Sequence, residues 1–290
     1  MFLLLTGDTS AGDNPSCRLA SHEEADFIWW GFPVPEKVRD LPGDFPVLPS
    51  MLTRAARLVS DFPMIIVRAG SFTPPRSPYM ETGAVPGGKP GERAAVKDSE
   101  RLWDCGFSIG RLLSRMGEDL VIAESVPGGH ETASALIVSL GLDDPQGSQE
   151  EIPGFSRGCF SGRGFEAVTA VGDPFQIIAA GILAGAKDRA EIVLAGDIRM
   201  LAVAALSRDL GYRGRFRLVT TGFSAPGLMP LADRIGVDVT GMEAGPVQDG
   251  AGAGGAVWYA EKLGISQEKV LLRAETLRKE ISLLSAAAGE

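Results

Sequence analysis

The chain has very little histidine and cysteine. Only two histidines, His22 and His130, occur in 290 residues, so a zinc site made of cysteine and histidine has too few ligands. No Ser-His-Asp set suggests itself either. The three cysteines, Cys17, Cys105 and Cys159, are far apart and odd in number, which favours reduced thiols over a disulfide framework. The sequence therefore predicts no metal site and no disulfide-stapled fold.

An excess of basic residues and a long hydrophobic run are also missing. Lys and Arg number 28 against 37 Asp and Glu, a net charge of −9, which argues against a nucleic-acid partner but not against a small anionic ligand in a local pocket. The opening MFLLLTGD has only five consecutive apolar residues and no basic region, so it predicts a strand and not a signal peptide. No stretch approaches the roughly 18 apolar residues of a membrane helix. We expect a cytoplasmic protein that does not bind membranes.

What the chain does have is an alternation of short apolar runs and helical patterns. Buried strands are predicted at 64–67, 119–123, 191–195 and 215–220, and helices at 98–116, 129–141, 174–186 and 198–210. This rhythm predicts an α/β fold of three layers, with a mainly parallel sheet covered by helices on both faces. Ligands of such sheets bind beyond the carboxyl ends of the strands. Candidate functional residues should therefore follow the strands.

Two Pro/Gly-rich stretches interrupt this rhythm. Residues 73–92 predict a lid or binding loop, and residues 143–164 predict a surface connection or an active-site flap. The C-terminal segment 253–290 reads as helical, and its last part is an amphipathic helix that packs on the domain or across a dimer interface. We predict a single domain over 1–290, with a smaller helical subdomain formed by the chain termini.

The segment VQDGAGAGGAVWYA at 247–260 is rich in glycine. Gly250, Gly252 and Gly255 fit the spacing G-x-G-x-x-G, but a dinucleotide site requires a strand before the first glycine and another after the helix. The preceding MEAGPVQD is not a strand pattern, and the 35 residues after Gly255 are nearly all helical in pattern. Two interpretations remain: the glycines permit a close turn under a helix, or Asp249 begins a ligand loop that leaves its carboxylate in a pocket.

A second candidate site lies in 121–140, where a predicted strand ends in Glu124. A turn with Gly128 and Gly129 follows, and a helix then opens with polar residues that include Thr132. Free N–H groups and the helix dipole make such a junction an anion site. A well-capped helix start explains the same residues, and the pattern alone does not decide between the two.

Two further turns follow the same design. Gly172 and Asp173 precede Pro174, which marks a helix start with aspartate as N-cap and proline in the first helical position. Capping alone explains these residues. Gly196 follows another predicted strand and permits close approach of the backbone to a ligand.

Five segments, taken in order, resemble one known family. ESVPGGHETA resembles ESVPGGTTTA and GEMGIGNTTA, AVGDPFQ is similar to AVGDPMQ, and VLAGDIRM is similar to VLAGGTQM. AGSFTPPRSPYMETGAVPG follows the pattern AGS…P..PY…G..PG, and DGAGAGG falls on the element E-G-T/S/V-G-A. The family is that of the nicotinate-nucleotide–dimethylbenzimidazole phosphoribosyltransferases, in particular its archaeal-type branch. The resemblance covers roughly residues 60–260.

The resemblance implies an enzyme that transfers phosphoribosyl from nicotinate mononucleotide to 5,6-dimethylbenzimidazole or a similar base. The products are nicotinate and α-ribazole 5′-phosphate, used in the lower ligand of cobalamin. It also implies a parallel sheet with a smaller domain, a homodimer, a nucleotide and an aromatic base as small-molecule partners, and no cofactor. Asp249 takes the position of the family's catalytic base. The implied substrate-binding positions are Glu124, Gly128, Gly129, Thr132, Gly172, Asp173, Gly196, Gly250 and Gly252.

Three departures from the family pattern fall at the expected site. Asp249 replaces a glutamate, which withdraws the carboxylate by ~1.5 Å. His130 and Glu131 replace hydroxyl residues where a phosphate is expected, and Asp197 replaces a small residue. These changes favour a competing hypothesis, a non-catalytic nucleotide- or base-binding relative in cobamide metabolism. A nicotinamide-dependent oxidoreductase is a third alternative, for which the sequence offers neither a cofactor site nor a hydride-acceptor site.

Overall fold

The structure is a computed structural model. It describes the following residues: 1–10, 20–32, 34–35, 38, 41, 44–91, 94–116, 119–143, 162–186 and 191–288. Cys17, Cys159 and nearly all of the predicted connection 143–164 lie outside the described residues, so the predictions for them are not tested.

One parallel sheet of seven strands forms the centre of the described residues, in the order β3-β2-β1-β4-β5-β6-β7. The strands are β1 (Phe2–Thr6), β2 (Met64–Arg68), β3 (Tyr79–Glu81), β4 (Leu120–Ser125), β5 (Ile192–Ala195), β6 (Arg217–Thr221) and β7 (Asp238–Met242). The chain builds outward from β1 through β2 to β3, and then returns to place β4 on the other side of β1. The neighbours β1 and β4 therefore form the topological switch point, where open α/β sheets bind ligands.

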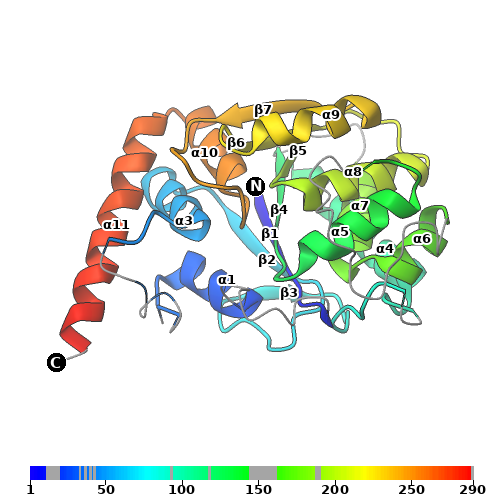
Figure 1. Cartoon of the computed structure of the whole chain (residues 1–290), viewed down its shortest axis with the longest axis horizontal. Coiled ribbons are helices and arrows are strands. Elements are labelled where there is room, and N and C mark those ends of the chain that lie inside the picture. Colours follow the sequence, from blue (N-terminus) through cyan, green and yellow to red (C-terminus); the bar gives the residue numbers. More distant parts are fainter. Residues whose placement is uncertain are drawn as a thin grey trace.

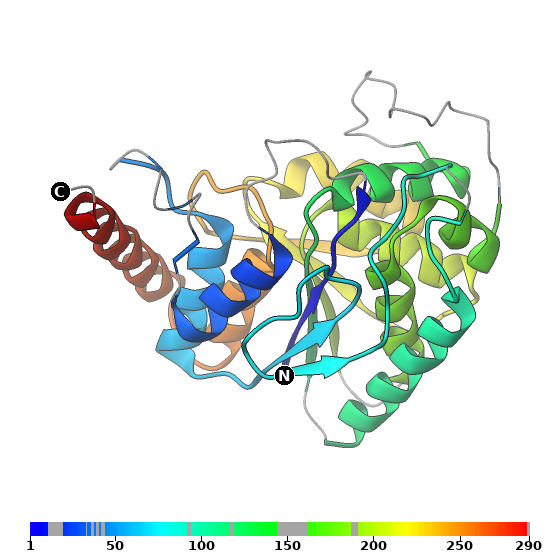
Figure 2. The same ribbon diagram turned by 90° about the horizontal axis from the view of Figure 1, so that it is seen from below.

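Helices cover both faces of the sheet, because the side chains of each buried strand alternate between two apolar faces. In β1, Leu3 and Leu5 belong to one core, and Phe2 and Leu4 belong to the other. The first face carries α4 (Ser99–Leu113), the short helix η2 (Ser114–Met116), α5 (Gly129–Ser139), α6 (Gly164–Val171), α7 (Pro174–Gly185), α8 (Ile198–Asp209) and α9 (Ala225–Ile235). The second face carries α1 (Ser21–Trp30), α3 (Pro49–Ser60), α10 (Ala253–Lys262) and α11 (Gln267–Ala288). Figures 1 and 2 show these two helical layers on either side of the strands.

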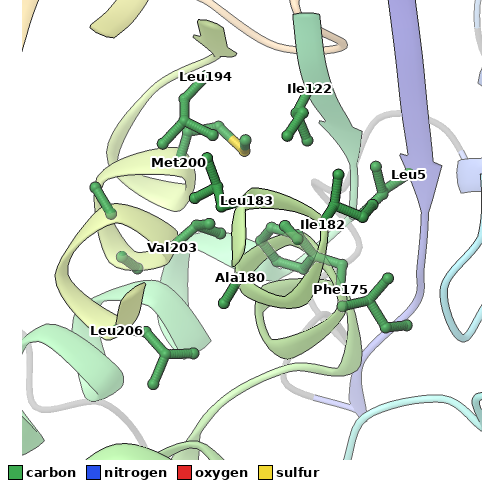
Figure 3. Packing of buried hydrophobic residues seen from close by; sticks show 14 of the residues in the cluster. Leu5, Ile122, Phe175, Ala180, Ile182, Leu183, Leu194, Met200, Val203 and Leu206 are labelled. Atoms are coloured by element: carbon green, nitrogen blue, oxygen red, sulfur yellow. The ribbon is translucent and has the colours of Figure 1, made fainter. Parts of the chain in front are cut away.

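Helix α7 is the centre of the first layer. Its sequence PFQIIAAGILAG is apolar almost throughout, and Phe175 and Ile182 are fully buried between the strands and the neighbouring helices (Figure 3). Glycines let α4 and α7 approach closely: a Cβ atom on Gly106 would lie 2.2 Å from the carbonyl oxygen of Ile178. The predicted helix at 174–186 is thus apolar almost all round and buried almost all round, as is usual for helices of this kind.

Both ends of the chain contribute to a smaller helical part. Phe27 of α1, Met51 of α3 and Ile281 of α11 form one apolar cluster with Val38 and Phe45. The predicted three-layer fold, with helices on both faces and a helical part from the chain termini, is confirmed. The single domain over 1–290 stays a prediction.

The predicted loop 73–92 contains a strand that the sequence pattern did not reveal. The three residues of β3 pair in parallel with the outer edge of β2, and Gly87 later forms a bridge to Thr9. The strand YME is short and largely exposed, so it carries no hydrophobic pattern, and it is ordered by the free edge of β2. None of the described helices is long and apolar enough to cross a membrane.

Candidate active site

Three neighbouring strands bring candidate residues to one edge of the sheet. Glu124 is near the end of β4, Gly196 follows β5, and Thr221 ends β6. Because these strands are parallel, their carboxyl ends meet at the same edge. The edge includes the switch point beside β1, where ligands of this sheet type bind.

Glu124 is a buried carboxyl group with one uncommitted oxygen. Its side chain is 0% exposed, and Oε2 accepts a hydrogen bond of 3.0 Å from the N–H of Val126. Oε1 lies 3.0 Å from Nε of Arg199 in an ion pair, but it receives no aligned hydrogen bond from the described residues. Burial raises the pKa of Glu124 to about 8; Arg199 opposes this shift, and Asp197 is among the acids that reinforce it. Much of this carboxyl group is therefore protonated at neutral pH and can donate a hydrogen bond.

Arg199, on the first turn of α8, is clamped by Asp197. Its Nε and Nη2 each donate a hydrogen bond of 2.9 Å to one oxygen of Asp197, which also caps α8 by accepting the backbone N–H of Arg199. Burial alone would raise the pKa of Asp197, but Arg199 outweighs burial and the pKa is lowered. Burial would likewise lower the pKa of Arg199, yet Asp197 and Glu124 raise it. Arg199 and Asp197 therefore form a pair in which both members are charged.

Three of the predicted glycines border the pair formed by Glu124 and Arg199. A Cβ atom on Gly129 would lie 3.1 Å from Cδ of Arg199, and one on Gly250 would lie 3.6 Å from its Nη2. Gly196 has a φ of +151°, and a Cβ atom there would lie 3.7 Å from Oε1 of Glu124. A Cβ atom at any of these three positions would therefore lie within 4 Å of the pair.

Asp249 is also buried, but backbone donors engage both of its oxygens. Oδ2 accepts hydrogen bonds from the N–H groups of Thr221 at 2.8 Å and Gly254 at 3.0 Å, and Oδ1 accepts one from Gly250 at 2.8 Å. Burial raises the pKa of Asp249 to about 6, Asp197 adds to the rise, and the backbone hydrogen bonds oppose it. Each carboxylate oxygen can accept two hydrogen bonds, so Oδ1 keeps one acceptor position. The group is largely ionised at neutral pH, as a general base must be.

The glycines after Asp249 pack α10 onto the sheet. Gly252 has a φ of +66°, and a Cβ atom there would lie 2.4 Å from Cβ of Ala123. A Cβ atom on Gly255 would lie 2.2 Å from Cβ of Ala195. Close packing thus accounts for Gly252 and Gly255, while Asp249 anchors the turn to the end of β6. The helices α10 and α11 follow this turn, without the second strand of a dinucleotide unit.

Around α5 and α6, two predicted residues have structural partners. The hydroxyl of Thr132 is buried and donates to the carbonyl oxygen of Gly129 at 3.1 Å. Gly172 ends α6, where a Cβ atom would lie 2.6 Å from Val168 and 2.8 Å from Oε1 of Gln176. Gly128 has a φ of +76° and begins α5 without a side-chain cap, so the first N–H groups of this helix lack a side-chain acceptor.

Asp173 lies near the end of β1, with Asp8 close enough to affect its charge. Its Oδ1 accepts the N–H of Phe175 at 3.2 Å, and its own N–H donates to Gln176 at 2.8 Å, which completes a capping box. Oδ2 is buried and has no partner among the described residues. Burial raises the pKa of Asp173 to about 8, with Asp8 reinforcing the shift. No hydrogen bond or ion pair joins Asp173 to the described residues of the Glu124–Arg199 pair.

Sequence reasoning missed two residues of the site, Arg199 and Glu24. Glu24, on α1, accepts a hydrogen bond of 2.6 Å from the hydroxyl of Ser125. Burial raises its pKa, and Ser125 and Arg199 oppose the rise. Arg199 stands three residues after Gly196, a spacing that could have drawn attention to it. Nothing in the sequence near Glu24 indicates that it meets the end of β4.

The fold and the site define an α/β protein with buried acids around the guanidinium of Arg199 at the carboxyl edge of a parallel sheet. Two solved structures from Thermus thermophilus share the fold. The nicotinate-nucleotide–dimethylbenzimidazole phosphoribosyltransferase has a TM-score of 0.63 and 17% identity over 95% of this chain and 82% of its own. The structure of CobT has a TM-score of 0.59 and 16% identity over the same shares.

Sequence comparison then shows the family. The UPF0284 protein of Thermococcus onnurineus is 31% identical over 97% of this chain and 94% of its own length. That of Methanothermobacter thermautotrophicus is 31% identical over 81% and 76%, respectively. The chain therefore belongs to the UPF0284 protein family. No family model matches it.

Proposed function

We propose that the protein is a phosphoribosyltransferase that uses nicotinate mononucleotide and 5,6-dimethylbenzimidazole or a similar base. The observation that carries the proposal is the pair of buried acids at one sheet edge, Asp249 and Glu124, with pKa values of about 6 and about 8. Two acids whose pKa values are pushed apart are suited to separate roles, one as base and one as hydrogen-bond donor. The fold shared with a phosphoribosyltransferase of this type supports the same assignment.

In the proposed reaction, a ring nitrogen of the incoming base attacks C1′ of the ribose. The bond from C1′ to the pyridinium nitrogen of the nucleotide breaks, and its electron pair stays on that nitrogen, which releases neutral-ring nicotinate. The attack comes from the opposite side, so β geometry becomes α. The N–H proton of the incoming base passes to Oδ1 of Asp249, which keeps one acceptor position. A positioned general base of this kind contributes roughly 10²–10⁴-fold.

The other predicted site residues take supporting roles in this proposal. Glu124 donates from its protonated oxygen to the nucleotide, and the uncapped start of α5 at Gly128 and Gly129 accommodates an oxyanion. Gly196 and Gly250 leave room beside Glu124 and Arg199. The roles of Thr132, Gly172, Asp173 and Gly252 in substrate binding stay predictions.

The test of the proposal is release of nicotinate and formation of α-ribazole 5′-phosphate from the two substrates, followed by chromatography and mass spectrometry. Asp249→Asn is the informative variant because it keeps the size of the side chain. We expect kcat to fall by roughly 10²–10⁴-fold, while the Kd for the nucleotide changes less than about threefold. The exposed Asp233→Asn on α9 is the matched control. If the wild-type protein releases no nicotinate with any benzimidazole offered, the proposal is wrong.

A specific observation favours the second candidate, a non-catalytic nucleotide- or base-binding protein of cobamide metabolism. Three backbone donors hold the Asp249 carboxylate in place, as they would in a purely structural turn anchor. Calorimetry separates the candidates: tight binding of nucleotide and base by the wild-type protein, with no turnover of the mixture, selects the binding protein.

A further inference from the structure

The charged side chains around Arg199 are mostly acids, which is unusual for a site that would bind an anion. Arg199 contacts Asp197 and Glu124, and the charges of Glu24 and Asp249 also influence this group of side chains. Burial raises the pKa of Glu24, and it raises the pKa of Glu124 to about 8, so that Glu124 carries less negative charge beside the guanidinium at neutral pH. Asp197 remains as the ionised partner, and it occupies the Nε and Nη2 edge of Arg199.

Several polar groups at or beside the Arg199–Asp197 ion pair have no hydrogen-bond partner on a described side chain. Nη1 of Arg199 makes no hydrogen bond to the part of the chain that the structure describes. Oε1 of Glu124 is buried, 3.0 Å from Arg199, and also without a hydrogen-bond partner there. The start of α5 is uncapped, and a Cβ atom on its first residue, Gly129, would lie 3.1 Å from Cδ of Arg199. A guanidinium, a protonated carboxyl and a helix start without a side-chain cap are the features that bind an oxyanion.

From this arrangement, and resting on the proposed function, we infer that Arg199 is the specificity-determining residue for an oxyanion of the nucleotide and that Asp197 is its competitor within the chain. In the free protein the Asp197 carboxylate holds the guanidinium. When the nucleotide binds, its oxyanion accepts hydrogen bonds from Arg199 and from the start of α5. The hydrogen bonds from Arg199 to Asp197 then weaken. The oxyanion is either the phosphate or the ring carboxylate of nicotinate mononucleotide, since both present oxygens to a guanidinium in the same way.

Calorimetric measurement of the affinity for three probes shows whether Arg199 recognises the phosphate or the ring carboxylate. Nicotinate mononucleotide carries both anions, nicotinamide mononucleotide keeps only the phosphate, and nicotinate riboside keeps only the carboxylate. Asp197→Asn preserves a good helix cap but removes the competing charge. We expect the Asp197→Asn variant to bind nicotinate mononucleotide about tenfold more tightly than the wild-type protein. The reason is that Arg199 then donates to a neutral amide, which competes less strongly with the oxyanion than the Asp197 carboxylate does. The probe that lacks the recognised anion gains less than about twofold.

Arg199→Gln and the double variant Asp197→Asn/Arg199→Gln complete a cycle. We expect Arg199→Gln to weaken binding of nicotinate mononucleotide by about tenfold or more, and to abolish the gain from Asp197→Asn in the double variant. Asp233→Asn, exposed on α9, removes the same charge elsewhere and leaves the affinity unchanged. Melting temperatures verify folding, and Asp197→Asn alone tests the inference if Arg199→Gln does not fold.

The outcomes separate this inference from the proposed function. If Asp197→Asn tightens binding through Arg199 but neither the wild-type protein nor any variant releases nicotinate, the inference stands and the phosphoribosyltransferase proposal is wrong. If the wild-type protein turns over the nucleotide and neither substitution changes its Kd by more than about twofold, the function stands and the inference is overturned. A protein that binds none of the three probes, as wild type or variant, overturns both.

Discussion

Asp173 and Asp249 are two buried aspartates in turns at the carboxyl edge of the sheet, 0% and 5% exposed. Burial raises the pKa of both, to about 8 for Asp173 and about 6 for Asp249. Asp173 accepts one backbone N–H and leaves Oδ2 without a partner among the described residues. Asp249 accepts three backbone N–H groups. Hydrogen bonds from the backbone therefore decide how far desolvation can favour the neutral acid.

The largest expected effect in this comparison is on folding stability. Asp249→Ala leaves three N–H groups, from Thr221, Gly250 and Gly254, without their acceptor. Because an unsatisfied buried donor costs about 1–3 kcal/mol, we expect the free energy of unfolding to fall by about 3 kcal/mol or more. Urea unfolding at pH 7 measures this change. A loss below about 1 kcal/mol would mean that Asp249 is not what holds the turn at the end of β6.

The next effect is on the pH dependence of stability. The pKa of Asp173 rises from 3.8 in the unfolded chain to about 8 in the folded one, so between these values the folded protein binds more protons. Its contribution to stability is present below pH 4 and is lost as the pH rises to about 8, by up to about 1.4 kcal/mol per pH unit. Asp173→Asn removes this contribution, and its unfolding free energy should fall less steeply from pH 5 to 8 than that of the wild-type protein. Equal slopes would contradict the assignment.

A smaller effect is expected when the Asp173 side chain is removed altogether. Asp173→Ala loses an N-cap, which costs about 0.5–2 kcal/mol, but it also removes a buried oxygen without a partner among the described residues. The substitution also removes the cost that the raised pKa of Asp173 imposes at pH 7. We therefore expect a loss of about 1 kcal/mol or less, or a gain, and in either case a result clearly more favourable than that of Asp249→Ala. Parallel urea titrations of the two variants provide the comparison. A larger loss for Asp173→Ala than for Asp249→Ala would reverse our ranking of the two turns.

The smallest effect concerns His130, which stands where the similar motif ESVPGGTTTA has a hydroxyl residue. Its side chain is exposed on the first turn of α5. We expect His130→Ala to change the free energy of unfolding by less than about 0.5 kcal/mol, as is usual for exposed positions. Thermal unfolding at pH 7 measures this, with Asp233→Asn, exposed on α9, as a second surface variant. A loss of unfolding free energy as large as that of Asp249→Ala would mean that His130 stabilises the fold as a buried acid does.

The sequence alone determined the main architecture, because strands buried on both faces and a helix buried all round have distinctive patterns. The runs that became β2, β4, β5 and β6 were located to within two residues, as was helix α7. The sequence also determined which turns carry candidate residues, since Glu124, Gly196 and Asp249 adjoin strand ends or glycine turns that a pattern reveals. The edge strand β3 was missed because three largely exposed residues have no periodicity.

The tertiary structure alone decided which candidates meet. It joined Glu124 to Arg199 and Asp197 across β4 and β5, and it placed Ser125 against Glu24, a hundred and one residues away in the chain. It separated Asp173 from that group, and it confirmed the N-cap role that the sequence predicts for this residue. The physical reason is that desolvation, pairing and hydrogen bonding depend on neighbours in space, and local sequence patterns encode only neighbours along the chain.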